Sequence, residues 1–157
     1  MTVSSEEIHD FLKEIGANRI VGVTVLAWFA AQMVKVVLGI YREKRFNWEW
    51  VFGTGGMPSS HAAGMASLAT SVGCVSGFDT PIFAVTSVVA LIIMFDAQGV
   101  RRATGKQAEL LNKIMDDIYK NKGIQEDRLK ELLGHTPVEV IMGALLGIFL
   151  SFLFFNL

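Results

Sequence analysis

The chain has 157 residues, of which 52% are hydrophobic and 18% are charged, and its formal net charge is −1. This composition is too apolar for an ordinary soluble domain, so we expect one all-α integral membrane domain over residues 1–157. The near-neutral charge gives no indication of a nucleic-acid partner, and none is expected. A single cysteine, Cys74, excludes an intramolecular disulfide and a multi-cysteine metal site.

The first 18 residues are rich in acidic side chains and contain Lys13 as their only Lys or Arg, the reverse of a secretory signal peptide. Apolar side chains recur after Ser5 at helical spacing, at Ile8, Phe11, Leu12 and Ile15. We expect a short amphipathic helix that lies at the membrane surface.

Four apolar segments follow and predict a bundle of about four transmembrane helices. They cover residues 19–41, 58–77, 81–97 and 137–157. The second segment is rich in Ala, Gly and Ser. Its small-residue face, formed by Ala62, Ala66 and Thr70, should therefore pack against other helices, within one chain or between copies.

A polar insert, residues 99–134, separates the third and fourth segments. Its apolar positions recur at helical spacing, and Asn121-Lys122-Gly123 interrupts them, which predicts two amphipathic helices outside the hydrocarbon. After the insert, Thr136-Pro137-Val138-Glu139 is typical of a helix start.

The order of the segments assigns the polar residues to two sides of the membrane. We call side A the side on which the first segment ends, and side B the other. All Lys and Arg residues except Lys13, Arg19 and Lys35 fall in loops on side A. Because cytoplasmic loops carry an excess of basic residues, side A is expected to be cytoplasmic.

The most informative motif is Pro58-Ser59-Ser60-His61, at the side-A start of an apolar segment. A helix N-terminus binds anions, and an ionisable side chain at this depth indicates function. Lys35 and Arg42 are seven residues apart and share a helix face. They either bind an anion or anchor the helix, with Lys35 extending to the interface.

Further polar residues reach side A from the third and fourth segments. The third segment ends near Asp96, Arg101 and Arg102. The two arginines either bind phosphate or anchor the helix at the membrane interface, with Asp96 as a salt-bridge partner. His135 and Glu139 are four residues apart, so the carboxylate either holds the imidazole in one tautomer or caps the helix at Thr136.

Together these residues match the needs of metal-free phosphoryl transfer. Cations and backbone N–H groups hold the phosphoryl oxygens, one histidine attacks phosphorus, and the other protonates the leaving alkoxide. No compact ligand spacing supports a metal site, and no cofactor is expected.

The order Lys-x6-Arg, Pro-Ser-x-His and Arg…His-x3-acid resembles the type 2 phosphatidic acid phosphatase superfamily, which also includes vanadium haloperoxidases. Three stretches resemble its divergent bacterial and plastid branch of small membrane proteins: residues 55–61, 96–102 and 133–140. Two departures are Glu139 in place of aspartate and the distance between the third motif's arginine and histidine, which residues 103–134 separate here.

The resemblance implies a role for each site residue. His135 would be the nucleophile, Glu139 would orient it, and His61 would be the general acid and then the base that activates water. The phosphate ligands would be Lys35, Arg42, Ser59, Ser60 and one of Arg101 or Arg102, with Asp96 as a structural residue near the site.

The implied activity is a lipid phosphatase of a bacterial inner membrane or a plastid-like membrane, with its active site on the cytoplasmic face. The expected substrate is phosphatidylglycerophosphate, then phosphatidic acid. The alternatives are a non-catalytic protein that binds anionic lipids and a small transporter component. Because four spans are few for such a site, a homo-oligomer is also expected.

Overall fold

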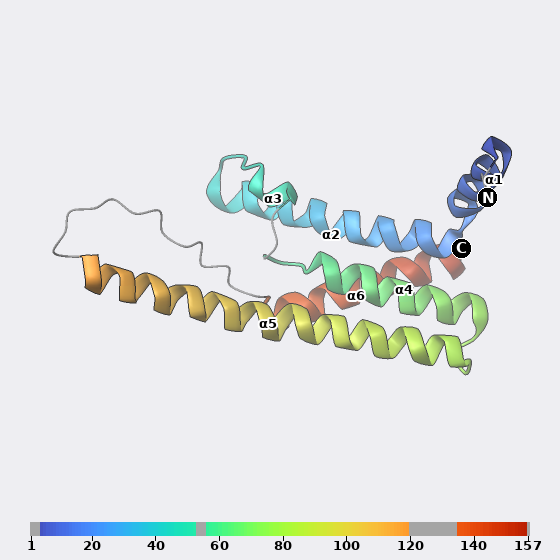
Figure 1. Cartoon of the computed structure of the whole chain (residues 1–157). Coiled ribbons are helices and arrows are strands. Elements are labelled where there is room, and N and C mark those ends of the chain that lie inside the picture. Colours follow the sequence, from blue (N-terminus) through green and yellow to red (C-terminus); the bar gives the residue numbers. More distant parts are fainter. Residues whose placement is uncertain (1–3, 53–55, 120–134, 157) are drawn as a thin grey trace.

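The computed structural model describes residues 4–52, 56–119 and 135–156, without the side chains of residues 49, 52, 99–106 and 116–119. The described residues form helices and no strand, which confirms the all-α class (Figure 1). The helices are α1 (Ser5–Ala17), α2 (Arg19–Glu43), α3 (Glu49–Phe52), α4 (Ser60–Ser76), α5 (Pro81–Tyr119) and α6 (Pro137–Asn156).

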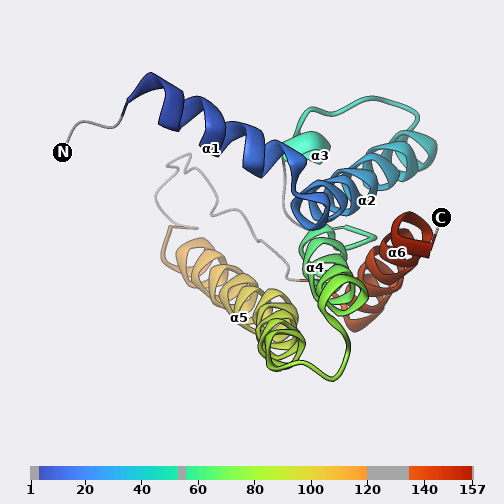
Figure 2. The ribbon, with the colours of Figure 1, turned by 90° about the vertical axis from the view of Figure 1, so that its right-hand side faces the viewer.

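Four of these helices form a bundle in which α4 is central. Viewed nearly along the bundle, α4 lies between α2, α5 and α6 (Figure 2). Helices α4 and α6 run parallel, since Ser59 N donates to the Glu139 carbonyl at 2.9 Å and Ser67 Oγ lies 2.9 Å from Ser151 Oγ farther along. Both therefore begin at side A, where α2 ends.

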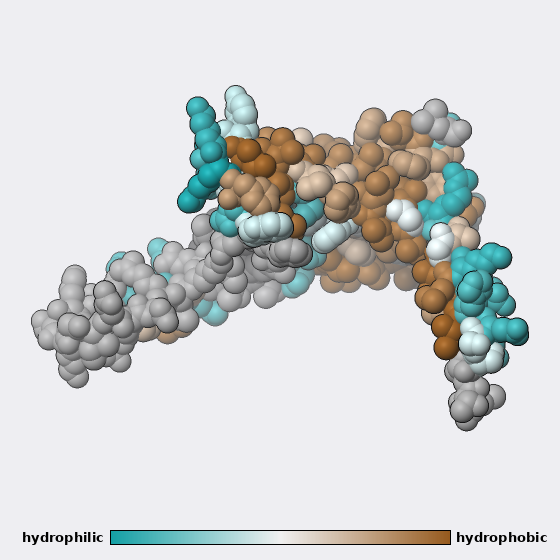
Figure 3. Space-filling model, turned by 90° about the horizontal axis from the view of Figure 1, so that it is seen from above, coloured by the Kyte–Doolittle hydropathy of each residue, from teal (hydrophilic) through white to brown (hydrophobic). Residues whose placement is uncertain are grey.

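Three described helices are long and apolar enough to cross a membrane: α2, the first part of α5 (Pro81–Gln98) and α6. Their outer side chains are apolar and exposed, as at Val37, Ile92 and Phe149, and Figure 3 shows an apolar surface over the middle of the bundle. The fourth expected span is α4, which has 17 residues and is mostly buried among the others. The arrangement is that of a helical membrane bundle.

Close contact between α4 and α6 depends on small residues. A Cβ atom added at Gly143 would overlap the Ser59 carbonyl oxygen, and one added at Gly147 would overlap that of Ala63. Farther along, the hydroxyls of Ser71 and Ser151 are joined by a 3.1 Å hydrogen bond. This is the small-residue packing that membrane helices use in place of a hydrophobic driving force.

Helix α5 differs from the prediction. The third segment was expected to end at Ala97, before a separate amphipathic helix, but α5 continues without a break to Tyr119. Residues 98–119 contain no proline, and Gly99 and Gly105 alone do not stop a helix that is otherwise rich in helix-forming residues. The second amphipathic helix and the turn at residues 121–123 lie outside the described residues.

Helix α1 confirms the predicted amphipathic helix near the N-terminus. Ser4 and Glu7 form a capping box, and the hydrogen bond from the Ser4 backbone N–H to Glu7 lowers the pKa of that carboxyl. The apolar positions Ile8, Phe11, Leu12 and Ile15 are all exposed. In Figure 3, α1 projects from the bundle with apolar and polar surfaces on opposite sides, so its membrane-surface position stays a prediction.

Candidate active site

Two histidines meet at the side-A end of the bundle. His61 lies in the first turn of α4 and His135 lies two residues before α6, with ring centroids 6.4 Å apart and ring planes at 60°. His135 is 1% exposed, although it follows a polar segment. Both rings are therefore close enough to contact one phosphoryl group.

The chain returns to α5 after the polar insert. His135 N donates a 3.4 Å hydrogen bond to the carbonyl oxygen of Ala97, at the residue where the apolar part of α5 ends. Ala97 and His135, the residues on either side of residues 98–134, are thus in direct contact. This explains how a histidine far along the chain reaches a site whose other residues come from α2 and α4.

Glu139 satisfies both interpretations of the sequence with one oxygen atom. Its Oε2 lies 3.1 Å from His135 Nδ1 and accepts the Thr136 backbone N–H at 3.1 Å, while Thr136 Oγ1 accepts Glu139 N–H at 3.3 Å. A carboxylate at this position favours the tautomer with hydrogen on Nδ1. Nε2 then carries the lone pair; it is buried and has no hydrogen-bond partner in the described part of the chain.

The two serines before His61 are both buried, but their positions differ. Ser59 is the N-cap of α4: its Oγ accepts the Ala62 backbone N–H at 3.3 Å, and its own N–H binds the Glu139 carbonyl. Ser60 is the first residue of α4 and is 4% exposed. Two helix N-termini, those of α4 and α6, thus meet beside the histidines, and each favours negative charge.

A buried cation, Lys35, lies next to this region and is 7% exposed. Its Nζ donates a 3.1 Å hydrogen bond to Gln32 Oε1, and Gln32 Nε2 donates to the carbonyl oxygens of Trp50 and Val51 at 2.9 and 2.7 Å. The Lys35 stem lies against Gly56, four residues before Ser60. Gln32 therefore connects Lys35 to α3, the short helix that precedes the histidine motif in the chain.

The remaining predicted residues lie farther out or cannot be placed. Arg42 is exposed, about 10 Å beyond Lys35 along α2, and Asp96 is exposed on α5 beside Ala97. The side chains of Arg101 and Arg102 are outside the described residues; their backbone positions on α5 begin one turn after Ala97. The structure thus brings together Lys35, Ser59, Ser60, His61, His135 and Glu139.

Two features that shape the site were not predicted from the sequence. Gln32 is a lone amide in an apolar helix, three residues before Lys35, and this spacing was a readable signal. The pattern Gly143-x3-Gly147-x3-Ser151 on α6 is the small-residue signature of close helix packing. No group of three or more His, Cys, Asp or Glu side chains that could hold a metal ion gathers within residues 4–52, 56–119 and 135–156.

Comparison with known proteins agrees with the motifs. The model of the family described as "Divergent PAP2 family" matches residues 16–150. The chain is also 42% identical to an uncharacterized membrane protein, YuiD, of Bacillus subtilis (strain 168), over 77% of this chain and 84% of the relative. No solved structure matches. Since the family model covers all the helices that bring the site together, the chain belongs to the divergent PAP2 family.

Proposed function

We propose that this protein is a metal-independent membrane lipid phosphatase that hydrolyses a phosphomonoester through a phosphohistidine intermediate. The observation that supports it best is the environment of His135: Nδ1 lies 3.1 Å from Glu139 Oε2, and Nε2 is buried without a hydrogen-bond partner in the described part of the chain. An oriented, desolvated imidazole nitrogen is a competent nucleophile. His61, 6.4 Å away between ring centroids, is placed to handle the proton.

The electrostatics of the site favour a bound phosphoryl group. Lys35 provides a buried positive charge, and the N-termini of α4 and α6 add their partial positive charges beside the histidines. Fixed donors and cations in a water-poor site stabilise charge that develops in the transition state. Ser60, at the first position of α4, and one arginine of α5 complete the proposed set of phosphate ligands.

The reaction takes place in two displacements. His135 Nε2 attacks phosphorus, the bond from phosphorus to the ester oxygen breaks, and His61 gives its proton to the leaving alkoxide. His61 then removes a proton from water, the water oxygen attacks phosphorus, and the bond to Nε2 breaks. Glu139 holds the Nδ1–H throughout and balances the positive charge that the imidazole gains.

The proposed substrate is phosphatidylglycerophosphate, followed by phosphatidic acid. The site lies at the side-A end of the bundle, and the distribution of Lys and Arg favours a cytoplasmic location for that side. Phospholipid precursors that carry a terminal phosphomonoester are presented at that surface. The relative's description as a membrane protein agrees with the location and does not specify a substrate.

The proposal is tested with purified protein in detergent that contains EDTA. Phosphatidylglycerophosphate, phosphatidic acid and undecaprenyl phosphate are supplied in turn, and released phosphate is measured. We expect release from at least one of them, unaffected by EDTA. Binding of these lipids without any release would instead indicate the anionic-lipid binder, and loss of release with EDTA would exclude the metal-independent mechanism.

Replacing Glu139 with glutamine separates its two contacts. Glutamine also serves at the third position of a capping box, so the free energy of unfolding should change by less than about 1 kcal/mol. The negative charge that balances the imidazolium is lost, so kcat should fall by at least about 100-fold. A fall in activity that matches a fall in thermal stability would mean that Glu139 acts as a cap alone.

Replacing Lys35 with methionine removes the buried charge and keeps a stem of similar length. If Lys35 holds phosphate, kcat/KM should fall by at least about 100-fold, as expected for a lost charge-assisted contact. Lys13→Met is the matched control, because Lys13 is exposed on α1. Equal activities of the two variants would remove Lys35 from the site.

A further inference from the structure

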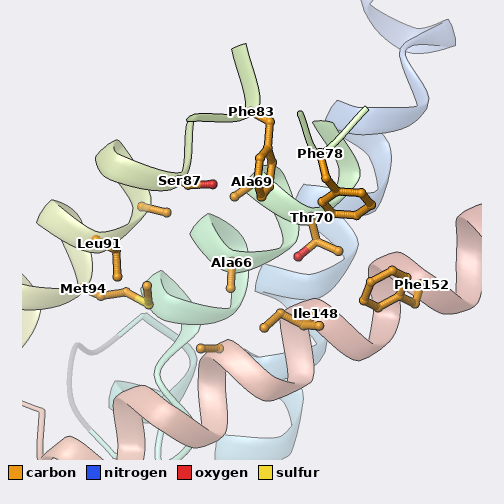
Figure 4. A pocket seen from close by; sticks show the side chains of 12 residues that line it. Ala66, Ala69, Thr70, Phe78, Phe83, Ser87, Leu91, Met94, Ile148 and Phe152 are labelled. Carbon is orange, nitrogen blue, oxygen red and sulfur yellow. The ribbon is translucent and has the colours of Figure 1, made fainter. Parts of the chain in front are cut away.

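An apolar groove runs along the outside of the bundle, between α4, α5 and α6. Its volume is about 400 Å³, within the usual range of small-ligand sites. Ala66, Ala69 and Thr70 of α4 form its floor, and α5 and α6, which make little contact with each other, form its walls (Figure 4). Because its walls are membrane-spanning helices, the groove faces the hydrocarbon of the bilayer.

The groove begins close to the candidate active site on all three helices. Ala66 lies five residues after His61 on α4, and Ala144 lies five residues after Glu139 on α6. On α5, Met94 lies three residues before Ala97, whose carbonyl binds His135. At about 1.5 Å per residue, the side-A end of the groove is within about 8 Å of the site along each helix axis.

The groove extends along most of the membrane span of α5, which covers Pro81–Gln98. Met94 at its side-A end and Phe83 at its side-B end are 11 residues apart on α5, or about 16 Å. Phe83 lies two residues after Pro81, where the span begins at side B. Phe78, Phe83 and Phe152 surround the side-B end, as Figure 4 shows.

We propose that this groove holds one acyl chain of the substrate while its phosphate lies between His61 and His135. The inference rests on the proposed phosphatase function and specifies its substrate as an acyl lipid. A fatty acyl chain that starts at the side-A headgroup region can lie along the groove towards the phenylalanines at its side-B end. A polyprenyl chain is much longer and has to leave the groove.

The polarity of the groove supports a hydrocarbon occupant. Its lining is almost entirely apolar, and the hydroxyls of Thr70 and Ser87 are the polar side-chain groups among the residues that line it. A narrow floor of alanines leaves room for a flexible chain, and methylene groups there gain contacts with Leu91 and Ile148. The headgroup and chain of one lipid can then occupy the site and the groove together.

The test fills the groove and compares long and short substrates. Ser87→Phe on α5 and Ala144→Phe on α6 add bulk to its lining, while Val88→Phe and Leu145→Phe place the same side chain at the adjacent exposed positions. Release of phosphate is measured from dioleoyl and dibutanoyl forms of the lipid that the native protein hydrolyses best. Undecaprenyl phosphate is a third substrate.

For both groove variants, kcat/KM on the dioleoyl lipid should fall by at least about tenfold and stay within about twofold on the dibutanoyl lipid. The two controls should match the native protein on both. Equal losses on long and short lipids, an effect confined to undecaprenyl phosphate, or a changed oligomeric state without chain-length dependence would overturn the acyl subsite. Inactivity of the native protein on every substrate would instead remove the proposed function, and this inference with it.

Discussion

Replacing His135 with glutamine should abolish phosphate release, by at least about 1,000-fold in kcat, because the substitution removes the nitrogen that we propose attacks phosphorus. Glutamine retains polar atoms of similar reach, so the fold should be kept. The measurement is steady-state release from the best lipid substrate, with the thermal midpoint of each protein determined in the same detergent. Lipid binding should persist, since Lys35 and the helix N-termini remain.

His9→Gln is the matched control for this variant. His9 lies on α1, with its side chain 79% exposed, far from the site along the bundle. It should behave as the native protein does. Activity of His135→Gln within tenfold of the native protein would show that His135 is not the nucleophile, whatever the role of His61.

Replacing Gly147 of α6 with alanine should lower the stability more than the same replacement at either glycine of α2, Gly22 or Gly39. The new Cβ would overlap the Ala63 carbonyl oxygen, and backbone cannot move aside as a flexible side chain can. We expect a loss of roughly 3 kcal/mol in the free energy of unfolding. A fall of the thermal midpoint in detergent is the measurement.

Gly22→Ala provides the control for helix propensity. No atom lies within 4 Å of a Cβ built at Gly22, so alanine there should be neutral or stabilise by less than about 1 kcal/mol. Gly143→Ala should behave like Gly147→Ala and also disturb catalysis, because Gly143 contacts the Ser59 carbonyl beside the histidines. Equal stability of Gly147→Ala and Gly22→Ala would contradict the close approach of α4 and α6.

The ends of the helices were predicted well from the sequence where a proline or a glycine turn marks them. Pro81 and Pro137 begin α5 and α6 at the expected residues, and Gly77 follows α4. The end of α5 could not be predicted from hydropathy, because a helix does not stop where its residues become polar. Only a backbone signal ends it, and residues 98–119 contain no proline.

The candidate site was predicted as a set of residue types, without its contacts. The motifs around His61 and His135 were readable, and the topology placed both at side A. Two facts depend on three-dimensional geometry: one oxygen of Glu139 serves both Thr136 and His135, and Gln32 links Lys35 to α3. From the sequence alone, orienting His135 and capping the helix at Thr136 were alternative roles for Glu139. Residue spacing does not show that two donors share one acceptor oxygen.

The central claim is that His135 becomes covalently phosphorylated during turnover. Native protein is mixed with its best lipid substrate, quenched in alkali, in which a phosphorus–nitrogen bond survives, and analysed by peptide mass spectrometry. Phosphate should appear on His135 before the steady state and be absent from His135→Gln. Turnover without phosphate on His135, or with phosphate on another residue, would contradict the account.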